Sequence, residues 1–67
     1  MKWARFLTVQ AAKAEAAFIL GSSTFKAGER LVVFKTADKP PRFDWSYPDD
    51  PRMSDRGIKI VCDVARG

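Results

Sequence analysis

The clearest hydrophobic patterns in the chain are two short runs, one near its middle and one near its end. Residues 31–36 read LVVFKT, and residues 58–64 read IKIVCDV. Both runs are rich in β-branched and aromatic side chains, which suit a pleated, half-buried surface. The second run alternates, so its even-numbered residues, Cys62 among them, are predicted to face a core together. We expect a strand in each run.

An alanine-rich segment at residues 9–20 predicts a helix, because alanine has the highest helix propensity. Thr8 is suited to N-cap this helix, and Gly21 to end it in the left-handed conformation. Residues 3–8 carry strand-forming side chains, and we expect a break near Thr8. The predicted fold is α+β, β-α-β-β, with one helix packed on a small sheet. The alternative is one long N-terminal helix followed by a β-hairpin.

Residues 37–57 connect the two runs and contain all four prolines of the chain. Within this connection Phe43 to Tyr47 alternates aromatic with small polar residues, which predicts a short edge strand with its rings on one side. The two flanking runs are expected to form a long hairpin. A connection of this length inside a compact domain is commonly functional.

A chain of 67 residues predicts a single domain, residues 1–67. Folding at this size buries only about 60% of the extended chain's surface, so stability is marginal. One cysteine and no histidine exclude an internal disulfide and a Cys/His zinc site. We therefore expect self-association as a homodimer, through the edge of the 31–36 strand. A lone cysteine fits a reducing compartment and predicts a cytoplasmic location.

The residue types that carry catalysis are sparse. Cys62 lies inside a predicted strand, and no histidine is present to activate it. Several aspartates gather between residues 44 and 55, but their spacing does not match a calcium-binding loop. We expect no enzymatic activity, no metal and no cofactor.

The charge balance and the aromatic residues favour a binding role. A net charge of +4 favours an acidic partner, although no two basic residues are adjacent. Aromatic and basic side chains alternate in the connection, and Trp, Tyr and Arg are the types that dominate protein–protein hot spots. The predicted partner-binding residues are Arg42, Phe43, Trp45, Tyr47, Arg52 and Arg56.

These residues predict a small binding protein, an inhibitor or regulator of the size that mobile elements encode, which occupies an acidic surface of a protein partner. The alternative function is a nucleic-acid-binding regulator, in which the rings stack on bases and the cations meet phosphates. Aspartates interleaved in the same segment oppose that alternative. A structural interpretation, in which the rings close a small core, also stays open. No membrane contact is expected, because no run approaches the roughly 18 apolar residues of a membrane span.

Overall fold

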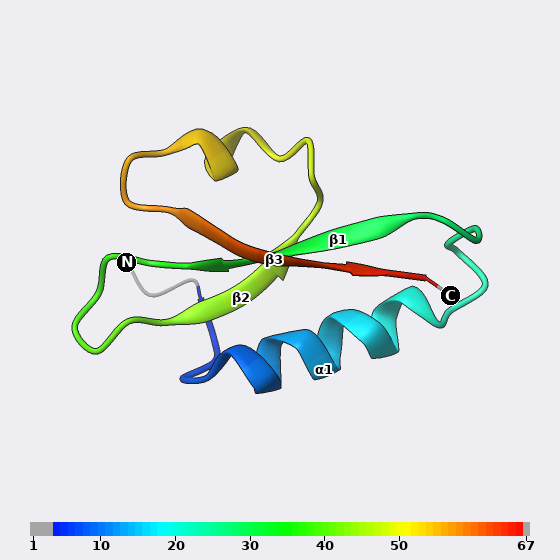
Figure 1. Cartoon of the computed structure of the whole chain (residues 1–67), viewed down its shortest axis with the longest axis horizontal. Coiled ribbons are helices and arrows are strands. Elements are labelled where there is room, and N and C mark those ends of the chain that lie inside the picture. Colours follow the sequence, from blue (N-terminus) through cyan, green and yellow to red (C-terminus); the bar gives the residue numbers. More distant parts are fainter. Residues whose placement is uncertain (1–3, 67) are drawn as a thin grey trace.

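The computed structural model describes residues 4–66, which form one α-helix and a three-stranded antiparallel sheet (Figure 1). The elements in chain order are α1 (Val9–Leu20), β1 (Arg30–Lys35), β2 (Phe43–Ser46), the 3₁₀ helix η1 (Pro51–Ser54) and β3 (Lys59–Ala65). The predicted α+β class is confirmed. In place of the expected first strand, Phe6 forms a single antiparallel bridge to Phe43, and residues 1–3 lie outside the described part.

The helix α1 has the predicted bounds. Thr8 is its N-cap, and its Oγ1 accepts a hydrogen bond from the Ala11 N–H at 3.2 Å. The face toward the sheet buries Ala12, Ala16 and Leu20. Two of these three side chains are alanines, so the helix axis can lie close to the strands.

The predicted left-handed cap at Gly21 is wrong. Gly21 has φ −73°, a right-handed helical value, and its N–H donates to the carbonyls of Ala17 and Phe18. The carbonyl of Leu20, the last helical residue, is satisfied from the other end of the chain. The Arg66 guanidinium donates to the carbonyl oxygens of Leu20 at 2.9 Å and Phe25 at 2.8 Å, and also to that of Ser22. Because this cation caps the helix, no left-handed turn is needed there.

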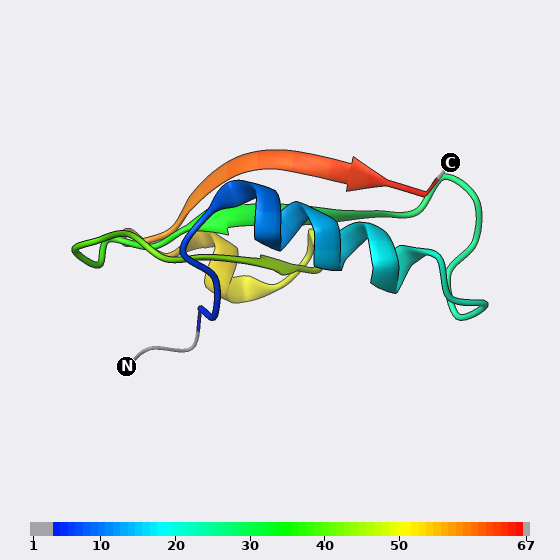
Figure 2. The same ribbon diagram turned by 90° about the horizontal axis from the view of Figure 1, so that it is seen from below.

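The strand β1 is the centre of the sheet, in the order β2-β1-β3. Both of its edges are paired, so the prediction of a dimer through the edge of this strand is wrong. Its residues Leu31–Phe34 are buried on both faces. Leu31 packs with Ala16 and Leu20 beneath α1, whereas Phe34 points to the opposite face. In Figures 1 and 2 the connection that carries η1 lies across the sheet from α1.

The strand β3 departs from simple alternation. Val33 pairs with Cys62, but the next residue, Phe34, pairs with Ile60, so β3 contains a bulge at Val61. Paired residues share a face, so Cys62 faces α1 and Ile60 faces away from it. The prediction that the even-numbered residues of this run share one face is therefore wrong for Ile60, and Cys62 is only half-buried.

Two structural predictions about the connection are confirmed, the long hairpin and the short edge strand. β1 and β3 form the long hairpin, and β2 folds back on the other edge of β1, with Val33 opposite Trp45. No helix in the described part of the chain is long and apolar enough to cross a membrane.

Candidate functional site

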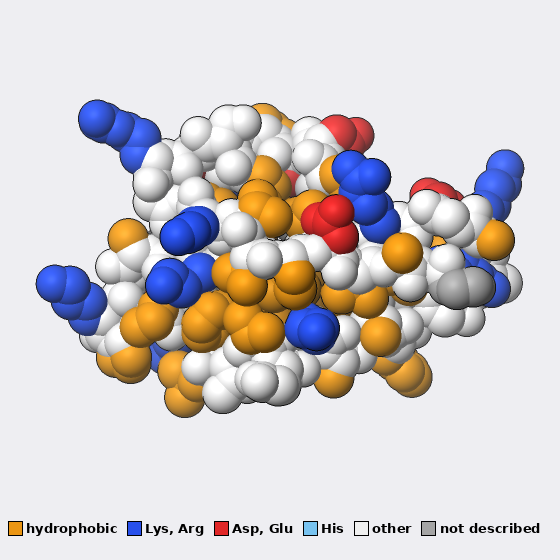
Figure 3. All heavy atoms as spheres, in the orientation of Figure 1, with side chains coloured by type: hydrophobic (Ala, Val, Ile, Leu, Met, Phe, Trp, Pro, Cys, Tyr) orange, Lys and Arg blue, Asp and Glu red, His pale blue; other side chains and the backbone are white. Residues whose placement is uncertain are grey.

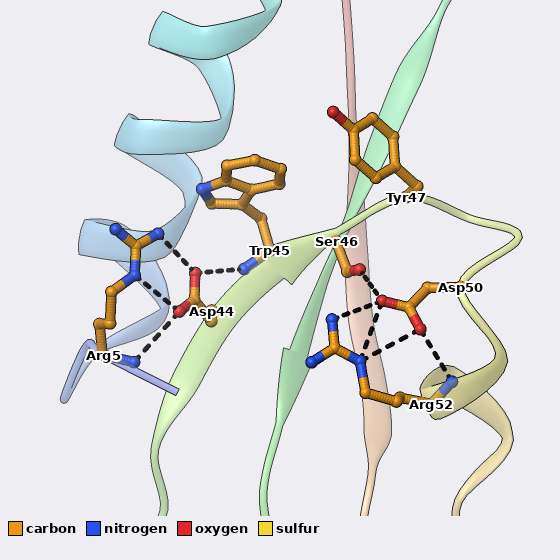
Figure 4. A pocket seen from close by; sticks show the side chains of 7 residues that line it. All are labelled: Arg5, Asp44, Trp45, Ser46, Tyr47, Asp50 and Arg52. Atoms are coloured by element: carbon orange, nitrogen blue, oxygen red, sulfur yellow. Dashed lines mark hydrogen bonds and ion pairs between the residues drawn. The ribbon is translucent and has the colours of Figure 1, made fainter. Parts of the chain in front are cut away.

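A cleft of about 320 Å³ runs along the outer edge of β2, beyond the Phe6–Phe43 bridge (Figure 4). Side chains from both faces of β2 reach it, together with the N-terminal segment and η1. Its lining residues are Arg5, Asp44, Trp45, Ser46, Tyr47, Asp50 and Arg52.

One wall of the cleft is a fixed pair between Arg5 and Asp44. Asp44 is only 5% exposed, and its carboxylate accepts two hydrogen bonds from the Arg5 guanidinium, both at 3.0 Å. The backbone N–H groups of Arg5 and Trp45 donate to the same carboxylate at 3.1 and 2.8 Å. These four hydrogen bonds replace the water that the carboxylate loses on burial.

The helix holds this wall in place through Glu15. Its Oε2 pairs with Arg5 Nη2 and also accepts a hydrogen bond from Trp45 Nε1 at 2.8 Å. The Trp45 ring in turn packs against the buried cluster of Ala16, Leu20 and Leu31. Three segments of the chain are therefore joined at this wall: the N-terminal segment, α1 and β2.

The other wall is built by Asp50, Arg52 and Ser46. Asp50 is the N-cap of η1 and accepts from the Arg52 backbone N–H at 2.9 Å and from Arg52 Nη2 at 2.7 Å. The Ser46 hydroxyl donates to the same carboxylate at 2.5 Å. The turn that brings Asp50 back to β2 is closed by its own N–H, which donates to the Tyr47 carbonyl at 3.0 Å.

Tyr47 lines the cleft from just past the end of β2 and is half exposed (Figure 4). Its ring lies edge-on to Trp45, with centroids 6.1 Å apart, and stacks on Phe25 at 6.3 Å. Figure 4 shows the Trp45 and Tyr47 rings directed to the same side of β2, as the alternation of this segment predicts. Contacts on two sides fix the ring at the mouth of the cleft.

Three charged groups of the cleft, Arg5, Asp50 and Arg52, have shifted pKa values. Hydrogen bonds from Arg52 and Ser46 hold the pKa of Asp50 well below its usual range, and the bond to Asp50 raises the pKa of Arg52. Hydrogen bonds to Asp44 and Glu15 raise the pKa of Arg5. These charged groups present donors and acceptors to a ligand.

The described residues contain no group of three or more acidic or Cys side chains arranged to hold a metal ion. Asp44 and Asp50 are instead each engaged by an arginine.

The structure brings together three of the six predicted binding residues, Trp45, Tyr47 and Arg52. The other three lie outside the cleft. Phe43 is half-buried beside Phe6. Arg42 precedes β2, and its backbone N–H donates to Thr36 Oγ1 at 3.1 Å. Arg56 is exposed in the turn after η1.

Sequence reasoning missed the polar half of the cleft: Arg5, Asp44, Ser46 and Asp50. The alternation around Trp45 does indicate that Asp44 and Ser46 share a face, and the pattern Asp50-Pro51-Arg52 is typical of a capped turn. Nothing in the local pattern indicates Arg5, which is 39 residues from Asp44 along the chain.

Comparisons with known proteins identify no relative: no family model, no curated protein and no solved structure matches this chain.

Proposed function

We propose that this chain is a small binding protein that acts by occupying a surface of a protein partner, as an inhibitor or regulator. One observation carries the proposal: Tyr47 is held half exposed at the mouth of a cleft between two arginine–carboxylate pairs. Tyrosine, tryptophan and arginine supply most of the binding free energy in protein interfaces. The proposal assigns no catalytic role.

Pre-organisation supports this proposal. Trp45 and Phe25 fix the Tyr47 ring, and the N-cap of η1 fixes Arg52. Pro48 and Pro51 restrict the backbone between them. Side chains that are already ordered lose little entropy on binding, which favours affinity.

The chemistry of the partner follows from charge. The chain carries +4, and its arginines form bidentate bonds with carboxylates in this very cleft. The net charge attracts an acidic partner surface to the chain as a whole, because the arginines of the cleft are already paired. A single free cysteine fits a reducing compartment such as the cytoplasm.

The test is capture from a lysate of the source cells on the immobilised chain, with and without nuclease. Tyr47→Ala should lower capture of a protein by about 30-fold, the equivalent of about 2 kcal/mol. Phe18→Ala is the matched control, because Phe18 is an 81% exposed ring on α1, away from the cleft. Capture that is equal for wild type and Tyr47→Ala would reject the cleft as the binding surface.

One observation favours a second candidate, a nucleic-acid-binding regulator. Lys35 and Lys59 lie directly opposite each other on β1 and β3, and two facing cations attract a polyanion. The carboxylates of the cleft oppose phosphate there. Nuclease-sensitive capture, or retention on DNA that falls steeply between low and high salt, would favour this candidate over the first.

A further inference from the structure

The outer edge of β3 is the long open edge of the sheet. β3 spans seven residues, and its pairing within the described part of the chain is with β1 alone. No proline or glycine interrupts residues 59–65. We propose that this edge binds an extended, acidic segment of a partner protein as an added strand. The proposal rests on the proposed function for the existence of a protein partner. It places a second contact at the β3 edge of the sheet, whereas the cleft lies at the β2 edge.

The backbone of β3 can accept such a strand. An edge strand presents unpaired N–H and C=O groups, which are a template for a further strand. The other edge of the sheet is partly closed, since Phe6 and Phe43 exchange two hydrogen bonds at 2.9 and 2.7 Å. Figure 2 shows β3 along one side of the molecule, with no other segment outside it.

The side chains of this edge are apolar and accessible. Ile60 is 41% exposed and Val61 42% exposed, because the bulge at Val61 turns neighbouring side chains outward. Figure 3 shows a continuous hydrophobic area on the β3 side of the molecule, with basic side chains at its border. An added strand would cover Ile60 and Val61.

The charge at one end of β3 indicates the chemistry of that strand. Lys59 and Lys35 are cross-strand partners and carry the same charge, which destabilises a strand pair. Neither lysine has an ion-pair partner among residues 4–66. A carboxylate on an added strand next to Lys59 would relieve this repulsion.

A second copy of the chain fits this edge poorly. An antiparallel copy centred on Val61 would bring Lys59 level with Asp63 of its partner. The bulge places these two residues on opposite faces, since Lys59 pairs with Lys35 and Asp63 with Val32. The two charges would not meet, and two chains of charge +4 repel each other.

The test uses the full chain labelled with ¹⁵N and a synthetic peptide of the length of β3, in which glutamate alternates with valine. When the peptide is titrated in, the amide resonances of residues 59–65 of the labelled chain should shift, and the hydrogen exchange of these amides should slow. Lys59→Glu should weaken binding of this peptide by about fivefold. The same variant should bind the counterpart peptide, with lysine in place of glutamate, more tightly than wild type does.

A peptide with every amide N-methylated is the matched control, because it keeps the side chains but has no N–H to donate from either edge. Equal binding of the methylated peptide would overturn the proposal, as would the absence of shifts along β3 or shifts confined to Tyr47 and Arg52. Concentration-dependent protection of residues 59–65 without peptide would assign the edge to a second copy instead. Capture that depends on Tyr47 tests the cleft separately, so either result can fail without the other.

Discussion

At the scale of single residues, the cleft shows two carboxylates held in different ways. Asp44 is nearly inaccessible and accepts bonds from a remote arginine and from the backbone. Asp50 is more accessible, and it is engaged by its near neighbours Ser46 and Arg52. The first pair is tertiary structure, whereas the second is a local turn. Only the second pair, Asp50 with Arg52, is formed by residues that are close together in the sequence.

The lowered pKa of Asp50 predicts a loss of stability in acid. Between its folded pKa and the unfolded value of about 4, the unfolded chain binds more protons at this group. Its contribution is therefore present above pH 4 and disappears as the pH falls. Asp50→Asn should lower the melting temperature at pH 7 and flatten its fall below pH 4, as measured by circular dichroism. Added salt should reduce the difference, because the pair is near the surface. Parallel pH profiles would contradict this assignment.

Trp45 decides between the interface and core interpretations of the aromatic segment. Its ring packs on the buried cluster and its N–H is bonded to Glu15, so the structure gives it a structural part. We expect Trp45→Ala to lower the free energy of unfolding by about 3 kcal/mol. Trp45→Phe keeps most of the ring but loses the hydrogen bond, and should cost about 1 kcal/mol. Urea denaturation of both variants measures this, and near-wild-type stability of Trp45→Ala would return Trp45 to the interface.

At the scale of elements, the parts of the fold that depend on local chemistry could be predicted from the sequence. The helix begins after Thr8 and ends at Leu20, because a cap and a run of alanines act within a few residues. The face of Ile60 could not be predicted, since the bulge at Val61 depends on how β3 meets β1. The prediction of a left-handed Gly21 failed for a similar reason. The end of its helix is capped by Arg66, which is 46 residues from Leu20 along the chain.

The cap by Arg66 makes a prediction of its own. Arg66→Ala removes the one nitrogen that donates to the carbonyls of Leu20, Ser22 and Phe25, and should cost about 2 kcal/mol of stability. Arg56→Ala is the matched control, because Arg56 is exposed in a turn, and should change stability by less than about 0.5 kcal/mol. Hydrogen exchange should show the Arg66→Ala loss first in the last turn of α1. Equal stability of the two variants would show that the carbonyls are satisfied by water.

At the scale of the whole molecule, the central strand β1 is buried on both faces, although residues 4–66 form only one α-helix. α1 covers the face with Leu31, and the connection that carries η1 lies over the face with Phe34. A half-buried strand is expected here from the sequence, whereas the four consecutive apolar residues 31–34 are buried on both sides of β1. The long connection therefore has a structural role as well as its proposed binding role. The pattern of residues 37–57 alone does not distinguish the two roles.

Alanine substitution of a buried and of an exposed phenylalanine tests whether packing on the face of the sheet away from α1 stabilises the fold. Phe34 is 0% exposed on the face away from α1, whereas Phe18 is 81% exposed. Phe34→Ala removes a ring that cannot be replaced by solvent and should cost about 3–5 kcal/mol. A domain of this size has only about 3–5 kcal/mol from its core, so we expect the variant to be largely unfolded at 25 °C. Phe18→Ala makes the same chemical change and should leave the urea midpoint nearly unchanged. A folded Phe34→Ala variant with native ¹⁵N resonances in residues 47–58 would show that the conformation of this segment does not depend on its packing against Phe34. The walls of the cleft would then be held by the hydrogen bonds of Asp44 and Asp50, without the packing of Phe34.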